Sequence, residues 1–146
     1  MKKNSIIITL LFALVGCNKT HYYVYSPDRK QCITIITDVD TRYIINGKYN
    51  SIPKTNFLQY SLDSIDVETG DEIVGHWKNG NYQWEIATDK AIILEDKLDK
   101  KEFIFKRNLP VDSIGIPTLK DFTDKNSFEI GFDHGKIIYK RGAIIE

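Results

Sequence analysis

The sequence predicts an all-β protein, a small antiparallel β-sandwich or barrel built from hairpins, with at most one short helix near residues 118–125. Three observations lead to this prediction. Hydrophobic residues recur with a period near two through most of the chain after residue 21. The apolar runs are short and rich in Ile, Val, Thr, Tyr, Phe and Trp. Asn-Gly and similar turn pairs follow several of them.

Ten short segments carry the strand pattern, in chain order: 23–25, 31–37, 42–45, 64–68, 72–77, 82–87, 91–94, 102–106, 128–132 and 136–140. Between the first two, Ser26-Pro27-Asp28-Arg29 predicts a type I turn, because Pro presets the φ angle that this turn needs. Residues 50–55 and 96–101 predict polar loops. An open sheet with one face against a short helix is the alternative architecture.

Turn pairs predict where the strands form hairpins. Asn46-Gly47 and Asn79-Gly80 predict two-residue hairpins, since Asn and Gly tolerate positive φ, and His134-Gly135 predicts a third. The expected cross-strand pairs are Lys78 with Asn81, Trp77 with Tyr82 and Gly75 with Trp84, then Phe132 with Ile137 and Ile130 with Tyr139. In the Gly75 pair, we expect the ring of Trp84 to cover the bare glycine.

One segment has helical character. Residues 117–125 could form one or two turns, with Thr118 as the N-cap and Asp121 three residues further on as a weak capping partner.

Composition sets the class of protein. The chain has 146 residues, 42% of them hydrophobic, and a formal net charge of zero. That length suits one domain, and the balance argues against disorder and against a nucleic-acid footprint.

The first residues have the pattern of an export signal. Lys2 and Lys3 precede an apolar run from Ile6 to Val15, which is too short to span a bilayer as a helix. The run ends in Leu14-Val15-Gly16-Cys17. Leu at the third position before the cleavage site does not suit an ordinary secretory signal, which needs small residues there.

Leu14-Val15-Gly16-Cys17 resembles the lipobox of bacterial lipoproteins. This resemblance covers residues 1–17 only. It implies that diacylglycerol is attached to the thiol of Cys17, that residues 1–16 are then removed, and that the freed amine is usually acylated, for example with palmitate. The alternative is a plain secreted protein with an incidental cysteine. Removing residues 1–16 removes two lysines, so the mature chain has a net charge of −2.

The predicted organisation is a signal peptide (residues 1–16), a short tether (17–21) and one β-rich domain (22–146). Two or three acyl chains would hold the protein stably. Asn18 stands where Asp, in well-studied enteric bacteria, resembles an inner-membrane retention signal, and no acidic cluster follows Cys17. Both features favour a lipid anchor in the outer membrane, with the domain facing the periplasm.

Motifs for chemistry are missing from the sequence. The histidines His21, His76 and His134 lack the spacing of a zinc motif, so we expect no metal site. Asp38 and Asp40 suit a solvated turn better than a calcium loop. Cys32, the remaining cysteine after lipidation, suits the core. No serine nucleophile motif or glycine-rich phosphate loop is present, so we expect a non-enzyme without a cofactor.

The aromatic hairpin around Asn79-Gly80 is the candidate binding surface. Its residues are His76, Trp77, Tyr82 and Trp84. An exposed aromatic platform could bind a glycan, a peptide or a membrane interface, whereas ordinary β-core is the competing interpretation.

These features predict a non-enzymatic envelope lipoprotein that binds a protein partner or stabilises an assembly at the membrane. Two alternatives remain open. One is a lipocalin-like barrel that holds a small apolar ligand in a central cavity. The other is an inhibitor or immunity protein that acts against an envelope-acting enzyme.

Overall fold

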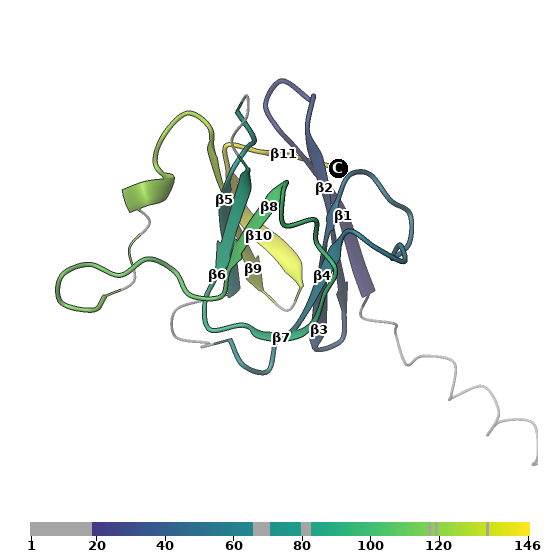
Figure 1. Ribbon diagram of the computed structural model, residues 1–146, viewed down its shortest axis with the longest axis horizontal. Coiled ribbons are helices and arrows are strands. Elements are labelled where there is room, and N and C mark those ends of the chain that lie inside the picture. The colour runs from purple at the N-terminus through teal and green to yellow at the C-terminus, as the bar shows by residue number, and fades with distance from the viewer. Residues whose placement is uncertain (1–18, 66–70, 80–82, 117, 119, 134) are drawn as a thin grey trace, which may run out of the picture.

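The computed structural model describes residues 19–146 except 66–70, 80–82, 117, 119 and 134. These residues form two β-sheets that pack face to face as a sandwich and do not close into a barrel (Figure 1). Sheet A has the strand order β11-β1-β2-β3-β4-β7, and sheet B has the order β10-β9-β5-β6-β8. The prediction of an all-β fold is confirmed, and of its two forms the sandwich is the one observed.

The strands are short, as the periodicity predicts. Sheet A contains β1 (Lys19–Tyr25), β2 (Cys32–Asp38), β3 (Thr41–Asn46), β4 (Phe57–Ser61), β7 (Ile92–Asp96) and β11 (Ile144–Ile145). Sheet B contains β5 (Asp71–His76), β6 (Trp84–Thr88), β8 (Phe103–Lys106), β9 (Ser127–Asp133) and β10 (Lys136–Arg141). Neighbouring strands are antiparallel except β6 and β8, which are parallel. Along the chain, β7 comes between β6 and β8 but belongs to sheet A, so the chain crosses from sheet B to sheet A and back.

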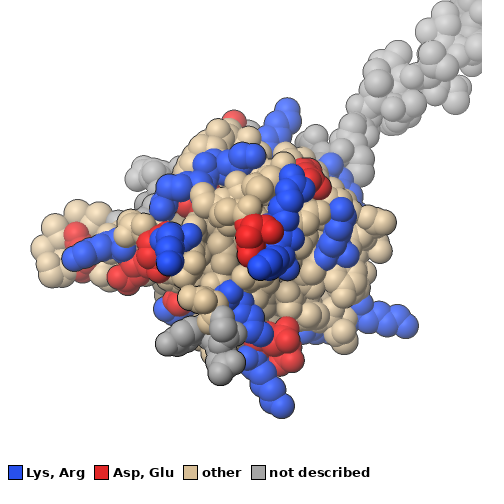
Figure 2. All heavy atoms as spheres, turned by 90° about the horizontal axis from the view of Figure 1, so that it is seen from above, with Lys and Arg blue, Asp and Glu red and all other residues tan. Residues whose placement is uncertain are grey.

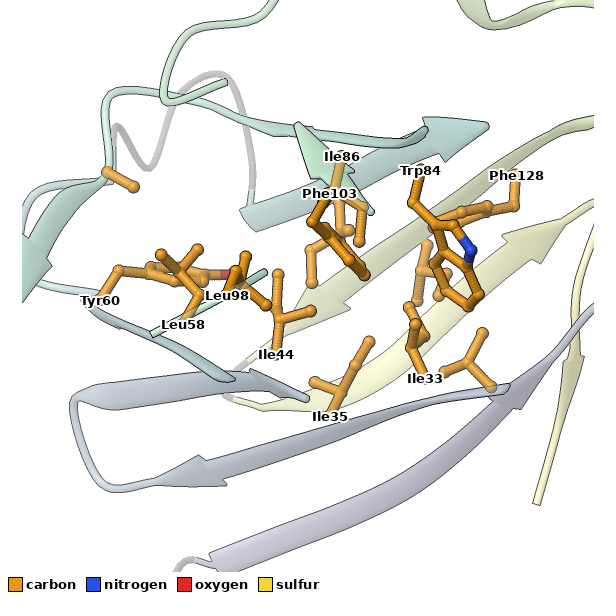
Figure 3. Close-up of a cluster of buried hydrophobic side chains, with 14 of the residues drawn as sticks. Ile33, Ile35, Ile44, Leu58, Tyr60, Trp84, Ile86, Leu98, Phe103 and Phe128 are labelled. Carbon is orange, nitrogen blue, oxygen red and sulfur yellow. The ribbon is translucent and has the colours of Figure 1, made fainter. Parts of the chain in front are cut away.

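The core lies between the sheets and is built from alternate residues of each strand. Ile33, Ile35 and Ile44 of sheet A face Ile86 and Phe128 of sheet B, and all five are fully buried (Figure 3). Since one apolar side chain of this size contributes about 1.5–3 kcal/mol when it is removed from water, the interface between the sheets is the main source of stability.

A buried ion pair joins the two sheets. Arg42 on β3 has no exposed side-chain surface and binds Asp71 on β5 through both terminal nitrogens. Its Nε donates to Thr37 Oγ1 at 3.1 Å, and the guanidinium lies 3.9 Å from the ring centroid of Phe132. Because the charge is neutralised and hydrogen-bonded, it can lie in the interior.

The predicted turn after β1 is confirmed, and the predicted pairing of β9 with β10 is confirmed in part, although His134 of its turn lies outside the described residues. In the turn after β1, the N–H of Arg29 donates to the carbonyl of Ser26 at 2.8 Å. In the hairpin of β9 and β10, Phe132 pairs with Ile137 as predicted, but Tyr139 pairs with Gly131 rather than with Ile130. A bulge between Ile137 and Tyr139 causes the shift, and it places the tyrosine ring over the glycine.

The Asn-Gly predictions are corrected. Asn46-Gly47 does not form a two-residue hairpin, because residues 47–56 connect β3 to β4. Gly47 does use a positive φ, of 105°. Its carbonyl accepts from Thr34 Oγ1 at 2.7 Å, so the connection folds back over the outer face of sheet A.

The β5–β6 hairpin has a different register from the predicted one. Gly75 pairs with Ile86, not with Trp84, and the ring that covers this glycine belongs to Phe128. The two registers differ by two residues, so both place the same side chains on the core face, and the alternation of apolar residues does not distinguish them. Gly80, Asn81 and Tyr82, which the other predicted pairs need, lie outside the described residues.

Other boundaries also shift. The strand β4 was not predicted. Of the strand predicted over residues 64–68, Ser64 and Ile65 form a turn and a bend, and residues 66–68 lie outside the described residues. The predicted helix is instead one 3-10 turn, η2 (Lys120–Phe122). At its start the N–H of Lys120 donates to Thr118 Oγ1.

Strand β1 begins at Lys19, so residues 19–21 are strand and not tether. They pair with Ile36–Asp38 of β2.

Candidate functional site

The predicted aromatic surface does not form a single exposed platform. Trp77 and Trp84 are both 5% exposed and pack edge to face in the core, with ring centroids 5.7 Å apart. The indole N–H of Trp77 donates to the carbonyl of Gly142 at 2.8 Å. The core interpretation therefore holds for both tryptophans. Tyr82 lies outside the described residues, and so does Cys17.

His76 points to the opposite, outer face of sheet B. Its Nδ1 lies 3.7 Å from a carboxylate oxygen of Glu85, and its Nε2 lies 3.7 Å from one of Asp124. The imidazole stacks on the ring of Phe122, with centroids 4.7 Å apart. Phe122 is fully buried on this face against Val74. His76 therefore helps to attach the segment before β9 to sheet B.

A small cleft lies at the end of the sandwich where β1 and β5 finish. It measures about 290 Å³ and is lined by Ser26, Asp28, Gln31, Trp77, Lys78 and Asn126, among others. Gln31 bridges the two sheets, because its Nε2 donates to the carbonyl of Lys78 at 2.7 Å and its Oε1 accepts from the N–H of Lys78 at 2.8 Å. The cleft is polar, and the side-chain amide of Gln31 in its lining already forms hydrogen bonds with the backbone of Lys78.

A projecting loop, residues 110–116, is the most exposed apolar feature of the described chain. It extends away from the sandwich, at the left of Figures 1 and 2. The side chains of Val111, Ile114 and Ile116 are 59%, 77% and 56% exposed. Leu109 and Phe122 lie on either side of this loop in the chain and are buried together on sheet B, so they fix its base.

Hydrogen bonds within the projecting loop hold its shape. The N–H groups of Ile114 and Ile116 both donate to Oδ1 of Asp112, at 3.0 and 2.9 Å. The N–H of Asp112 donates to the carbonyl of Ile116 at 2.9 Å, and that of Gly115 to the carbonyl of Asp112 at 3.1 Å. Gly115 has a φ of 85°, a conformation that glycine adopts without strain. The apolar tip is therefore a preorganised, convex surface.

A pair of glutamates lies on the outer face of sheet B. Burial is the main cause that raises the pKa of Glu72 on β5 to about 7, and its hydrogen bond to Glu129 and the charge of that group add to the rise. Glu129 on β9 accepts from Tyr139 Oη at 2.8 Å and from Arg141 Nε at 2.9 Å. Arg141 also donates to the carbonyl of Phe122 at 2.7 Å. The raised pKa of Glu72 thus has its origin in burial beside Glu129, which itself contacts the neighbouring strand β10.

Sequence reasoning missed both the projecting loop and the glutamate pair. For the loop, a signal was present: aliphatic residues without strand alternation lie around Gly115 and between Pro110 and Pro117. For the pair, Glu72 and Glu129 are far apart in the chain, and only the β5–β9 pairing brings them together.

The described residues contain no group of three or more His, Cys, Asp or Glu side chains able to hold a metal ion. Within the same part of the chain, no helix is long and apolar enough to cross a bilayer. Comparison of the chain with protein-family models, with curated proteins and with solved structures gives no match.

Proposed function

We propose that this protein is a non-enzymatic lipoprotein of the bacterial cell envelope that binds a protein partner through its projecting loop. In this proposal, Cys17 carries the lipid, the outer membrane holds the anchor, and the sandwich faces the periplasm. The lipobox-like residues 14–17 support the anchor. The exposed, preorganised tip of the loop is the single observation that supports the binding role.

The apolar side chains of the tip are what such an interface needs. Exposed aliphatic side chains that gather on a projection are typical of interaction sites, whereas isolated ones are ordinary surface. Here Val111, Ile114 and Ile116 lie within one loop of seven residues, 110–116. Because Asp112 already fixes the loop, binding would cost little conformational entropy. The partner would present an apolar recess that accepts the isoleucines.

The position of the loop suits a protein attached through its N-terminus. β1 begins at the right of Figure 1, and the projecting loop lies at the far left, on the other side of both sheets. A partner could therefore reach the tip while the other end of the sandwich remains next to the membrane.

An inhibitor or immunity role is a second candidate. A rigid convex loop is complementary to a concave site, and the substrate cleft of an enzyme is such a site. A lipocalin-like role has less support. It needs a closed barrel around a cavity, whereas here two open sheets pack on side chains that are fully buried.

Photo-crosslinking in intact envelopes tests the proposal. A benzoylphenylalanine at Ser113, on the loop, is compared with one at Thr55, an exposed residue on the connection between β3 and β4. We expect a discrete adduct from position 113 only, and its loss when Ile114 and Ile116 are both replaced by Ser. An equal adduct from position 55, or one that survives the double replacement, would contradict the binding role.

The anchor needs a separate test. We expect Cys17→Ser to stop processing by lipoprotein signal peptidase, and the mature wild-type N-terminus to carry acyl chains by mass spectrometry. An unmodified thiol at position 17 with residues 1–16 still attached would refute lipidation.

A further inference from the structure

In the turn between β2 and β3, Val39 has a backbone conformation that valine rarely adopts. Asp38 pairs with Thr41, so Val39 and Asp40 form the tip of a tight hairpin. Val39 has a φ of 53°, in the left-handed region. This region is disfavoured for side chains that branch at Cβ, and turns normally place Gly, Asn or Asp there. The valine is also 63% exposed, so its methyl groups contact water and not the core.

This turn lies next to the first residue of β1. Lys19 pairs with Asp38 across the two strands, and its Nζ lies 3.7 Å from Asp38 Oδ2. Figure 1 shows the start of β1 and the β2–β3 turn at the same end of sheet A. An apolar side chain is thus exposed beside the point where the N-terminal segment joins the domain.

The length of chain before Lys19 limits its distance from an anchor at Cys17. Only Asn18 separates the two residues, and two residue steps span at most about 7 Å. The headgroup region on one side of a bilayer is of about the same thickness. A lipid on Cys17 therefore holds the start of β1, and the turn beside it, at the membrane surface.

We infer that the β2–β3 turn is a bilayer contact, in which Val39 enters the headgroup region of the leaflet that holds the Cys17 lipid. This inference rests on the lipidation in the proposed function. A valine in a strained and exposed turn position is then explained by an apolar contact that forms only at the membrane. The charge of Asp38 is compensated by Lys19. Asp40 adds a negative charge at the tip, so the turn suits zwitterionic lipids better than anionic ones.

The test uses the full lipidated protein with Cys32→Ser, so that one introduced thiol carries an environment-sensitive NBD label. The label is placed at Val39→Cys or, as the matched control, at Ile114→Cys on the projecting loop, which is also mostly exposed but remote from β1. Vesicles of phosphatidylcholine and phosphatidylethanolamine are recovered by flotation. Brominated lipids in the same vesicles then report contact by quenching.

We expect the protein to float with the vesicles, with the label at position 39 shifted to the blue and quenched at least about twofold. The label at position 114 should change little. Replacing a third of the lipid with phosphatidylglycerol should reduce the quenching at position 39. Flotation with an unquenched label at position 39 would overturn the inference and leave the anchor intact. Failure of the processed protein to float would instead refute the lipid anchor of the proposed function.

Discussion

Replacing Glu72 with Gln should stabilise the protein at neutral pH. The carboxyl lies half-buried on β5 beside Glu129, which already accepts hydrogen bonds from Tyr139 and Arg141. A glutamine can still donate to Glu129, but it carries no charge to desolvate. The wild-type protein must either keep a proton on Glu72 or place two anions together.

The magnitude follows from the pKa of Glu72, which rises from 4.5 to about 7 on folding. At about 1.36 kcal/mol per pKa unit, the full rise corresponds to at most about 3.4 kcal/mol. Because the group is only half-buried, solvent screening reduces this value, and we expect about 1–2 kcal/mol. The folded-state pKa is raised, so the stability that Glu72 contributes is fully present below pH 4.5 and is lost as the pH rises to about 7.

Urea unfolding of the wild type and the variant at pH 4.5, 6 and 8 measures this effect. The gain in the free energy of unfolding from Glu72→Gln should be near zero at pH 4.5 and reach its full value by pH 8. Glu95→Gln is the matched control, since Glu95 is a strand glutamate that pairs with Lys97 at the surface. A gain that does not depend on pH, or a loss at pH 8, would refute the reasoning.

Three further predictions concern the core, a tight turn and the projecting loop. Arg42→Ala should lower the free energy of unfolding by about 3–5 kcal/mol in urea titrations, because it leaves Asp71 without its partner between the sheets. Gly142→Ala should cost about 2–4 kcal/mol by the same assay, since φ is 66° and a Cβ would clash with the Ser127 carbonyl. Asp112→Ala should raise amide hydrogen exchange about tenfold in the projecting loop and leave the melting temperature unchanged, because it removes two local hydrogen bonds.

Two of these predictions have a matched control variant, and the third has an outcome that would contradict it. Arg29→Ala removes a surface ion pair with Glu146 and should cost less than about 1 kcal/mol, so an equal loss at both arginines would contradict the role of burial. At Gly131 the atoms nearest to an added Cβ belong to the ring of Tyr139, which is 41% exposed and can move, so Gly131→Ala should cost less than Gly142→Ala. Unchanged exchange in the Asp112 variant would mean that the loop does not depend on that carboxylate.

The sequence allowed the fold class to be predicted because strand periodicity is a local property. The register of the strand pairs was harder to predict than the fold class. The turn pair Asn79-Gly80 predicts that Gly75 lies opposite Trp84, but Gly75 pairs with Ile86, and a shift of two residues leaves the apolar alternation unchanged. Strand β4 was missed because Phe57 and Leu58 are both buried, so the alternation of apolar and polar residues that marks a half-buried strand breaks there.

The candidate surfaces were harder still to predict. Aromatic residues in a hairpin indicate either a core or a platform, and only the packing of the two sheets decides for Trp77 and Trp84. The glutamate pair depends on which strands become neighbours, and composition carries no information about that. The projecting loop lies outside regular structure, where hydrophobic periodicity has no meaning.

The pairing of the first strand, β1, with the last strand, β11, affects the order of folding. Sheet A receives its last strand, β11, from residues 144–145, which close beside Val24 and Tyr25 of β1. As the chain emerges from its N-terminus during synthesis, β1 must therefore wait for almost the whole polypeptide before its second neighbour arrives. Such distant pairings slow folding to milliseconds or longer. A chain that lacks its final residues would leave this edge open to pairing with another molecule.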